Sequence, residues 1–184
     1  MIFGLNLSEQ TTGTDSRGVV REYFRRSSCQ EDGLIVPEAG WAQINVTESN
    51  YGAIRGLHAE ATDKLVGIIS GEAYGVWIDG RPGSATFGNV VTAQLRPGLK
   101  VFVPSGVLNG FQSLADPSQY LYCFSAEWSR DMEGFSVNPL DEELGIRWPV
   151  SISHENRDQI SEKDATSPTW ESTRRILLNR SASS

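Results

Sequence analysis

The sequence predicts an all-β fold, a sandwich or jelly roll, on two observations. Glycine (18 residues) and proline (8 residues) recur between short apolar segments, a spacing typical of many strands joined by turns. The segments are rich in β-branched and aromatic residues, and consecutive short antiparallel strands at this spacing favour a sandwich or jelly roll over a parallel α/β sheet. With 184 residues and 39% apolar content, the chain is long enough to bury one substantial core.

The middle of the chain carries the clearest strand signals. Gly71-Glu72 separates two apolar runs and predicts a tight hairpin. Residues 81–84 and Arg96-Pro97-Gly98 predict further turns, because proline presets φ and glycine permits positive φ. We expect strands at residues 64–70, 73–79, 86–95, 100–104 and 119–128.

After Pro149 the character of the sequence changes. Residues 151–167 are polar, with a plausible helical turn at residues 161–164. Thr169 could cap a short helix that carries Trp170 and Leu177 at roughly helical spacing. We therefore expect residues 1–184 to form one domain, with a helical extension at about residues 151–180.

Charge and composition exclude several classes of function. The net charge of −7 argues against nucleic-acid and membrane-surface partners, because phosphate binding needs a basic face. Cys29 and Cys123 are too few for a disulfide framework and favour thiols in a reducing cytoplasm. The start of the chain lacks the pattern of a signal peptide, and no apolar run approaches the roughly 20 residues of a membrane helix.

The two histidines bear on the possible chemistry. His58 and His154 are far apart in the sequence, and transition metals favour several imidazole ligands, so we expect no metal site. An imidazole titrates near neutral pH, which makes His58 the natural general base. The alternative is a strand histidine that is merely satisfied by its neighbours.

A series of motifs follows in order along the chain: Arg55-Gly56-Leu57-His58, Lys64-Leu65-Val66, residues 79–88, Pro104-Ser105-Gly106, Asn109-Gly110-Phe111, Tyr122 and residues 144–149. This order resembles the RmlC-like dTDP-4-dehydrorhamnose 3,5-epimerase family. The resemblance runs from about residue 15 to residue 164 and implies a cupin-type β jelly roll.

The resemblance implies a catalytic constellation that needs no cofactor. His58 corresponds to the family's base and Asp164 to the carboxylate that orients it. Tyr122 corresponds to the acid on the opposite face of the sugar, and Lys64 to a cation near the 4-keto oxygen, where it would stabilise an enolate. Without the resemblance, Asp164 is better read as a surface acid, and Tyr122 is equally suited to packing. For Lys64 the less favoured alternative is a solvated lysine at the start of a strand.

The sequence departs from the family in the expected site. Asn109 stands where most members have a histidine that helps to hold the 4-keto oxygen. An amide donates a neutral hydrogen bond, so it stabilises an enolate less than a charged donor does. Glu60 replaces a usual glutamine, and Glu127-Trp128 replaces a tyrosine pair that borders the sugar. These differences indicate altered regiochemistry, an altered sugar or reduced activity.

The resemblance also implies nucleotide-binding residues. The segment of residues 15–24, with Arg17 and Glu22, matches an N-terminal segment that reaches the nucleotide site of a neighbouring subunit, which predicts a homodimer with exchanged segments. Arginine suits phosphate oxygens. The remaining expected substrate contacts are Arg55, Gln43, Asn45, Trp128 and Glu133.

The predicted function is epimerisation of a dTDP-linked 4-keto-6-deoxy sugar at C3, at C5 or at both. The C4 ketone acidifies the protons on both neighbouring carbons, so a base, an oxyanion site and an opposite-face acid are sufficient. Two alternatives remain open: a keto-isomerase of the cupin superfamily, and a jelly roll that binds the sugar nucleotide without turnover.

Overall fold

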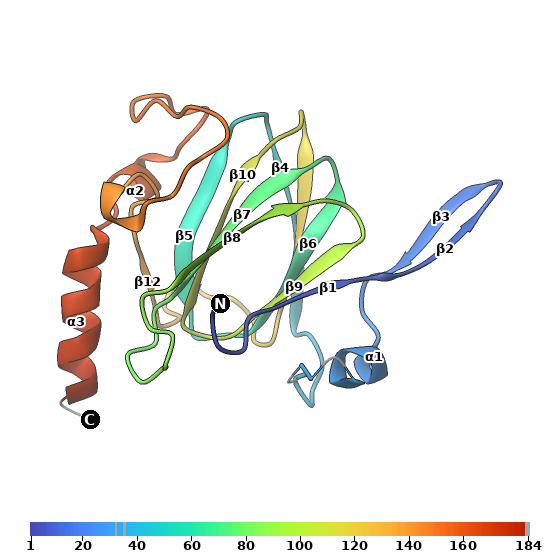
Figure 1. Cartoon of the computed structure of the whole chain (residues 1–184), viewed down its shortest axis with the longest axis horizontal. Coiled ribbons are helices and arrows are strands. Elements are labelled where there is room, and N and C mark those ends of the chain that lie inside the picture. The colour runs from blue at the N-terminus through green and yellow to red at the C-terminus, as the bar shows by residue number, and fades with distance from the viewer. Residues whose placement is uncertain (32, 35, 183–184) are drawn as a thin grey trace.

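Two antiparallel five-stranded sheets make up the body of the molecule in this computed structural model, which describes residues 1–31, 33–34 and 36–182 (Figure 1). The first sheet has the order β1 (Asn6–Glu9), β9 (Leu99–Val103), β6 (Lys64–Ser70), β11 (Ser118–Phe124) and β4 (Gln43–Ser49). The second sheet has the order β12 (Gly134–Ser136), β5 (Ile54–Glu60), β10 (Val107–Ser113), β7 (Ala73–Asp79) and β8 (Val90–Leu95). The predicted all-β jelly roll with short C-terminal helices is confirmed.

The main core fills the space between the sheets. Val66 and Val101 of the first sheet pack with Trp77 and Phe111 of the second, and all four are fully buried. A second apolar cluster covers the outer face of the second sheet, where Trp170 of the C-terminal helix contributes. Strand β10 is therefore buried along its whole length and shows none of the alternation expected of a half-exposed strand.

Two predicted strands are shorter than expected. β8 begins at Val90 and not at residue 86, because the Thr86 hydroxyl donates to the Asp79 carboxylate (2.6 Å) and closes a turn. β11 ends at Phe124 and not at residue 128, because the Ser125 hydroxyl accepts the Asp63 N–H (2.9 Å) and the strand pairing stops. In both places side-chain hydrogen bonds replace the backbone ladder.

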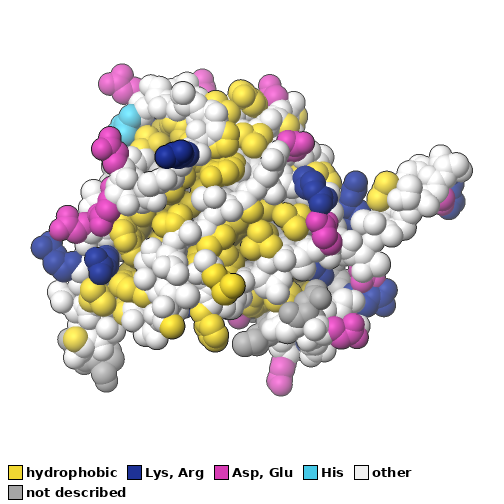
Figure 2. All heavy atoms as spheres, viewed as in Figure 1, with side chains coloured by type: hydrophobic (Ala, Val, Ile, Leu, Met, Phe, Trp, Pro, Cys, Tyr) yellow, Lys and Arg dark blue, Asp and Glu magenta, His cyan; other side chains and the backbone are white. Residues whose placement is uncertain are grey.

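The N-terminal part includes a hairpin that stands clear of the body (Figures 1 and 2). Its strands, β2 (Thr11–Asp15) and β3 (Gly18–Glu22), pair with each other, and nearly all of their residues are exposed. Helix α1 (Arg26–Glu31) follows and packs Cys29 against the first sheet.

The C-terminal segment crosses the second sheet and then covers it. A 3₁₀ turn, η1 (Glu142–Leu144), precedes a loop that leads to the short helix α2 (Glu162–Ala165), whose N-cap is Ser161. The last helix, α3 (Trp170–Ala182), begins where the Thr169 hydroxyl accepts the Ser172 N–H (3.3 Å), so the expected cap is present. No helix in the described part of the chain is long and apolar enough to cross a membrane.

Candidate active site

A cavity of about 450 Å³ opens between the edges of the two sheets, beneath the segment that contains α2. Strand β4 contributes Asn45 to its wall, β5 contributes Arg55 and His58, and β11 contributes Tyr122. Asp164 of α2 lines the same cavity. The fold thus brings together residues as far apart in the sequence as Asn45 and Asp164.

Gly56 fixes the position of His58 on strand β5. Its φ of +113° is one that residues with a Cβ rarely adopt, and a Cβ there would lie 2.7 Å from the Asn109 carbonyl oxygen. The pairing of β5 with β10 shifts register at this point, and His58 comes to lie opposite Asn109. The glycine of the motif therefore allows the close strand approach that sets His58 beside Asn109.

His58 and Asp164 form a hydrogen-bonded pair. His58 Nε2 lies 2.7 Å from Asp164 Oδ1, and the Asp164 side chain is only 7% exposed. Burial acts to raise the pKa of Asp164, but the hydrogen bond and charge of His58, with the Gly56 N–H, outweigh burial and lower it. The carboxylate therefore stays ionised at neutral pH, where it can orient the imidazole and stabilise its protonated form.

Tyr122 lies on the facing sheet and lines the same cavity as His58. Burial raises the pKa of its phenol well above the usual value, and the charge of Arg55 opposes that shift only in part. Its ring stacks on Phe124 with a centroid distance of 5.8 Å. At neutral pH Tyr122 is therefore a protonated phenol held in a fixed place across from the histidine.

Lys64 forms an ion pair with Glu60 at the inner end of the site. Both side chains line a small cavity of about 50 Å³, together with His58 and Asn109. The Lys64 ammonium is 4% exposed and lies 5.9 Å from the centre of the Phe124 ring. A cation is thus present at the end of the cavity, and a carboxylate contacts it.

Asn109 presents its amide to the same small cavity. The buried Tyr120 hydroxyl donates to the side-chain oxygen (Oδ1) of Asn109 at 3.4 Å. Burial raises the pKa of Tyr120 well above its usual value, so the hydroxyl keeps its proton. With its oxygen engaged, the Asn109 amide has N–H groups left to donate to a ligand.

The expected substrate-binding residues fall into two groups, of which the first lies at the cavity mouth. Arg55 Nε donates to the Ser49 hydroxyl (2.9 Å), which holds the guanidinium at the wall. Gln43 Nε2 donates to the Asn45 side-chain oxygen (3.1 Å), and Gln43 Oε1 accepts a hydrogen bond from the backbone N–H of Trp128 (2.8 Å). Asn45, Arg55 and Trp128 therefore line the large cavity, and Gln43 contacts two of them from beside it.

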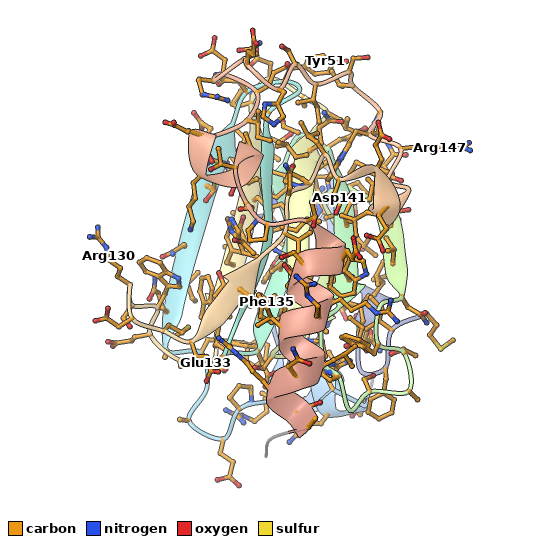
Figure 3. All side chains as sticks on the ribbon, turned by 90° about the vertical axis from the view of Figure 1, so that its left-hand side faces the viewer. Tyr51, Arg130, Glu133, Phe135, Asp141 and Arg147 are labelled. Carbon is orange, nitrogen blue, oxygen red and sulfur yellow. The ribbon has the colours of Figure 1, made fainter. Side chains whose placement is uncertain are left out.

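The second group lies away from that opening. Glu133 precedes β12 and lines a separate cavity of about 350 Å³ beside α3, with Phe135 on the adjoining strand (Figure 3). Arg17 pairs with Asp15 at the tip of the hairpin (2.6 Å). Glu22 pairs with Arg25 at the base of the hairpin. Within one subunit these residues do not meet the histidine.

The structure adds two residues that the sequence analysis did not assign to the site, and it gives Glu60, which that analysis named, a partner. Arg157 and Lys163 line the large cavity from the segment above it, and Glu60 contacts Lys64. The pairing of Glu60 with Lys64 could have been predicted from the sequence, because the two residues carry opposite charges, are four positions apart and flank a short turn. Arg157 and Lys163 had no such signal, because residues 151–167 are mostly polar and these two cations do not stand out among them.

The assembled groups suit one kind of chemistry, removal and return of a proton next to a carbonyl group. A histidine oriented by a carboxylate faces a protonated phenol, and a cation and an amide lie at the end of the cavity. In the part of the chain that the structure describes, no three His, Cys, Asp or Glu side chains group together as a metal site.

Comparisons with known proteins show which family the chain resembles. The family model for dTDP-4-dehydrorhamnose 3,5-epimerase matches residues 1–172. An RmlC homolog of Streptococcus pyogenes is 36% identical over 159 residues, covering 84% of this chain and 78% of the relative. The dTDP-4-dehydro-6-deoxyglucose 3-epimerase of Streptomyces bikiniensis is 33% identical over 177 residues, covering 92% and 86%.

Solved structures give the same result. The crystal structure of ChmJ, a 3'-monoepimerase from Streptomyces bikiniensis in complex with dTDP-quinovose, superposes with a TM-score of 0.84 at 32% identity. The superposition covers 96% of this chain and 89% of ChmJ.

Proposed function

Because this chain belongs to the dTDP-4-dehydrorhamnose 3,5-epimerase family, we infer that it is a dTDP-sugar epimerase of deoxysugar biosynthesis, an isomerase acting on carbohydrates. We propose further that it works without a cofactor on a dTDP-linked 4-keto-6-deoxyhexose and inverts C3 alone. The observation that carries the mechanism is the His58–Asp164 pair, which faces Tyr122 across one cavity.

The proposed reaction begins with His58. Its imidazole takes the proton from C3, and the electron pair of the broken C–H bond forms the C3–C4 double bond of an enolate with its charge on the C4 oxygen. Asp164 holds the ring and stabilises the imidazolium that results. Tyr122 then gives its proton to C3 from the opposite face, which inverts that carbon. Proton exchange with solvent restores both side chains, so the net reaction changes only configuration.

Lys64 and Asn109 hold the C4 oxygen in this proposal. Negative charge on that oxygen exists only after the proton has left, so donors placed there favour the transition state over the bound ketone. The support is that both side chains line the small cavity next to His58.

The dTDP moiety binds at the mouth of the large cavity. Arg55 meets the diphosphate, because its guanidinium is fixed at the wall and suits phosphate oxygens. Gln43, Asn45 and Trp128 border the sugar and the nucleotide. Arg17, Glu22 and Glu133 complete the nucleotide site, the first two from a second subunit.

The protein acts as a homodimer in which the β2–β3 hairpin crosses to the partner. The hairpin stands clear of its own subunit and exposes Val20, whose side chain is 76% exposed on the described chain. An exposed apolar side chain on a projecting hairpin is stabilised when a partner covers it, and pairing also protects sheet edges.

Cys29 and Cys123 are both free, which supports a reducing compartment, the cytoplasm.

Restriction to a single carbon rests on two features of the oxyanion site, and the choice of C3 rests on a relative. Asn109 is a neutral donor to the C4 oxygen, and Glu60 pairs with Lys64, so the oxyanion site carries little net positive charge. A weakly held enolate is formed less readily, which favours exchange at one position. In addition, the 3-epimerase of Streptomyces bikiniensis, whose name specifies that carbon, is a relative over most of the chain.

Solvent exchange tests the proposal directly. The protein is incubated with dTDP-4-keto-6-deoxyglucose in deuterated water, and NMR follows deuterium at each carbon and the configuration of the product. We expect deuterium at C3 with inversion, and none at C5. The matched control, His58→Asn, should lower exchange by about 10²–10⁴-fold while dTDP binding is kept. A keto-isomerase would move the carbonyl group, and a binder without turnover would show no exchange at all.

A further inference from the structure

We propose that Glu60 sets the charge of the oxyanion site, because its carboxylate compensates the ammonium of Lys64 and thereby slows enolate formation. This role rests on the epimerase function proposed above and adds to it a residue that acts through Lys64. Glu60 is a positioning residue in this scheme, since it touches the cation and not the reacting carbon.

The fold brings these two charges together. Glu60 is the last residue of β5 and Lys64 is the first residue of β6, and a short turn joins them. Hydrogen bonds from elsewhere in the chain fix that turn: the Asp63 N–H donates to the Ser125 hydroxyl (2.9 Å), and the Ser105 N–H donates to the Asp63 carboxylate (2.8 Å). The backbone therefore holds Glu60 and Lys64 close together, unlike a mobile ion pair on the surface.

The pair is shielded from water. The side chains of Lys64 and Glu60 are 4% and 19% exposed. Charges interact more strongly where water is scarce, so a carboxylate in contact with the ammonium cancels much of its field nearby. Negative charge on a C4 oxygen next to Lys64 is then stabilised less than it would be by a lysine without a carboxylate partner.

The pair also faces the reacting groups. Side chains two residues apart on a strand share a face, so Glu60 projects to the same side of β5 as His58. Both line the small cavity with Lys64, Asn109 and Tyr122. Arg55, the other permanent cation at that cavity, is held by Ser49, so it does not take the place of Lys64.

Glu60→Gln is the direct test, because glutamine keeps the shape and can still accept a hydrogen bond from Lys64 without the negative charge. The assay is release of deuterium from substrate labelled at C3, which reports enolate formation before Tyr122 acts. We expect kcat for release to rise about tenfold with little change in KM, since only the developing enolate gains. Glu72→Gln is the matched control. It removes a carboxylate that accepts a hydrogen bond from Gln94 of β8, away from the cavity, so the rate of deuterium release should not change.

A double-mutant cycle separates this role from a structural one. If Glu60 acts through Lys64, Glu60→Gln gives no gain in a Lys64→Met background. A gain of the same size in that background, or a fall in kcat in the single variant with thermal stability kept, would overturn the proposal. Should the glutamine variant fold poorly, Glu60→Ala must show the same rise in kcat.

The same assay distinguishes failure of the function from failure of the inference. Wild-type protein that releases no deuterium would refute the epimerase function itself. Normal release by the wild type, without a gain in Glu60→Gln, refutes only the role of Glu60.

Discussion

Tyr120 and Tyr122 lie on one face of β11 and yet have different chemical surroundings. Tyr120 is fully buried, stacks on Phe111 at 4.1 Å between ring centres and donates to Asn109. Tyr122 lines the cavity opposite His58. Tyr120 therefore holds the side-chain amide of Asn109, whereas Tyr122 remains available at the cavity wall for the proton transfer that we propose.

Replacing Tyr122 with Phe should separate proton removal from inversion. His58 can still remove the C3 proton and, after exchange with solvent, return a deuteron to the same face. We therefore expect deuterium incorporation to continue within about tenfold of wild type while the inverted product falls by about 10²-fold or more. NMR of the product in deuterated water measures both quantities in one sample. Equal losses of incorporation and inversion would mean that Tyr122 does not act as the separate acid.

The residues of the site differ in how far the sequence alone could predict them. Composition and strand pattern single out His58, because a histidine on a strand is rare in this chain. Asp164 and Lys64 follow only from the family resemblance, because each resembles an ordinary surface charge. The structure buries both, at 7% and 4% side-chain exposure. Burial of a charge depends on distant segments, which local pattern does not reveal.

At the scale of elements, the turn after β7 is organised around one buried carboxylate. Asp79 has no exposed surface, and it accepts hydrogen bonds from Arg81 Nε (2.8 Å) and from the hydroxyls of Ser84 and Thr86 (both 2.6 Å). These bonds close the loop that joins β7 to β8. Arg81 also donates to the Phe3 carbonyl oxygen (2.6 Å), which ties the N-terminal segment to the same turn.

Asp79→Asn should destabilise the protein in a pH-dependent way. Burial acts to raise the pKa of Asp79, but the hydrogen bonds from Arg81, Ser84 and Thr86 outweigh it and hold the pKa below its ordinary value of 3.8. A lowered pKa in the folded state contributes stability that is complete above pH 3.8 and is lost as pH falls through the folded value. We expect a loss of about 3 kcal/mol at pH 7, because the substitution breaks a buried ion pair.

Urea unfolding of both proteins between pH 7 and pH 3 measures this effect. The difference in unfolding free energy should be constant from pH 7 to about pH 5 and should shrink at lower pH. A difference that stays constant down to pH 3 would show that the charge of Asp79 contributes nothing and that shape alone matters.

The elements themselves were predictable where turns and β-branched runs coincide. The hairpin of β6 and β7 matches the sequence prediction at both ends, with Gly71 at a φ of +78°. The strand pattern alone did not predict β10. This strand lies in a sheet that is covered on both faces, so buried and exposed residues do not alternate along it. The projecting β2–β3 hairpin also lacked a strand signal, since almost all of its residues are exposed. Periodicity reports a half-buried strand and fails for one that is fully buried or fully exposed.

At the scale of the whole molecule, the position of the hairpin bears on the dimer that we propose. Arg17 and Glu22 lie on or beside β2 and β3, away from the cavity that holds His58 in the same chain (Figure 1). A second copy that receives the hairpin would acquire both residues at its cavity mouth. Light scattering at micromolar concentration should therefore give the mass of a dimer, and removal of residues 11–22 should give a monomer.

Complementation between two inactive variants tests whether Arg17 acts on the partner's site. Arg17→Ala should raise KM with little effect on folding, because the side chain is 88% exposed in the subunit, and His58→Asn should abolish proton removal. In a mixed dimer, the subunit with Arg17→Ala keeps its own His58 and receives an intact hairpin from its partner, so one site is complete. Co-expression in equal amounts should then restore about a quarter of wild-type sites at low substrate, since half of the dimers are mixed and each has one good site. Activity equal to the average of the two separate variants would place Arg17 at the site of its own subunit and would exclude the exchanged hairpin.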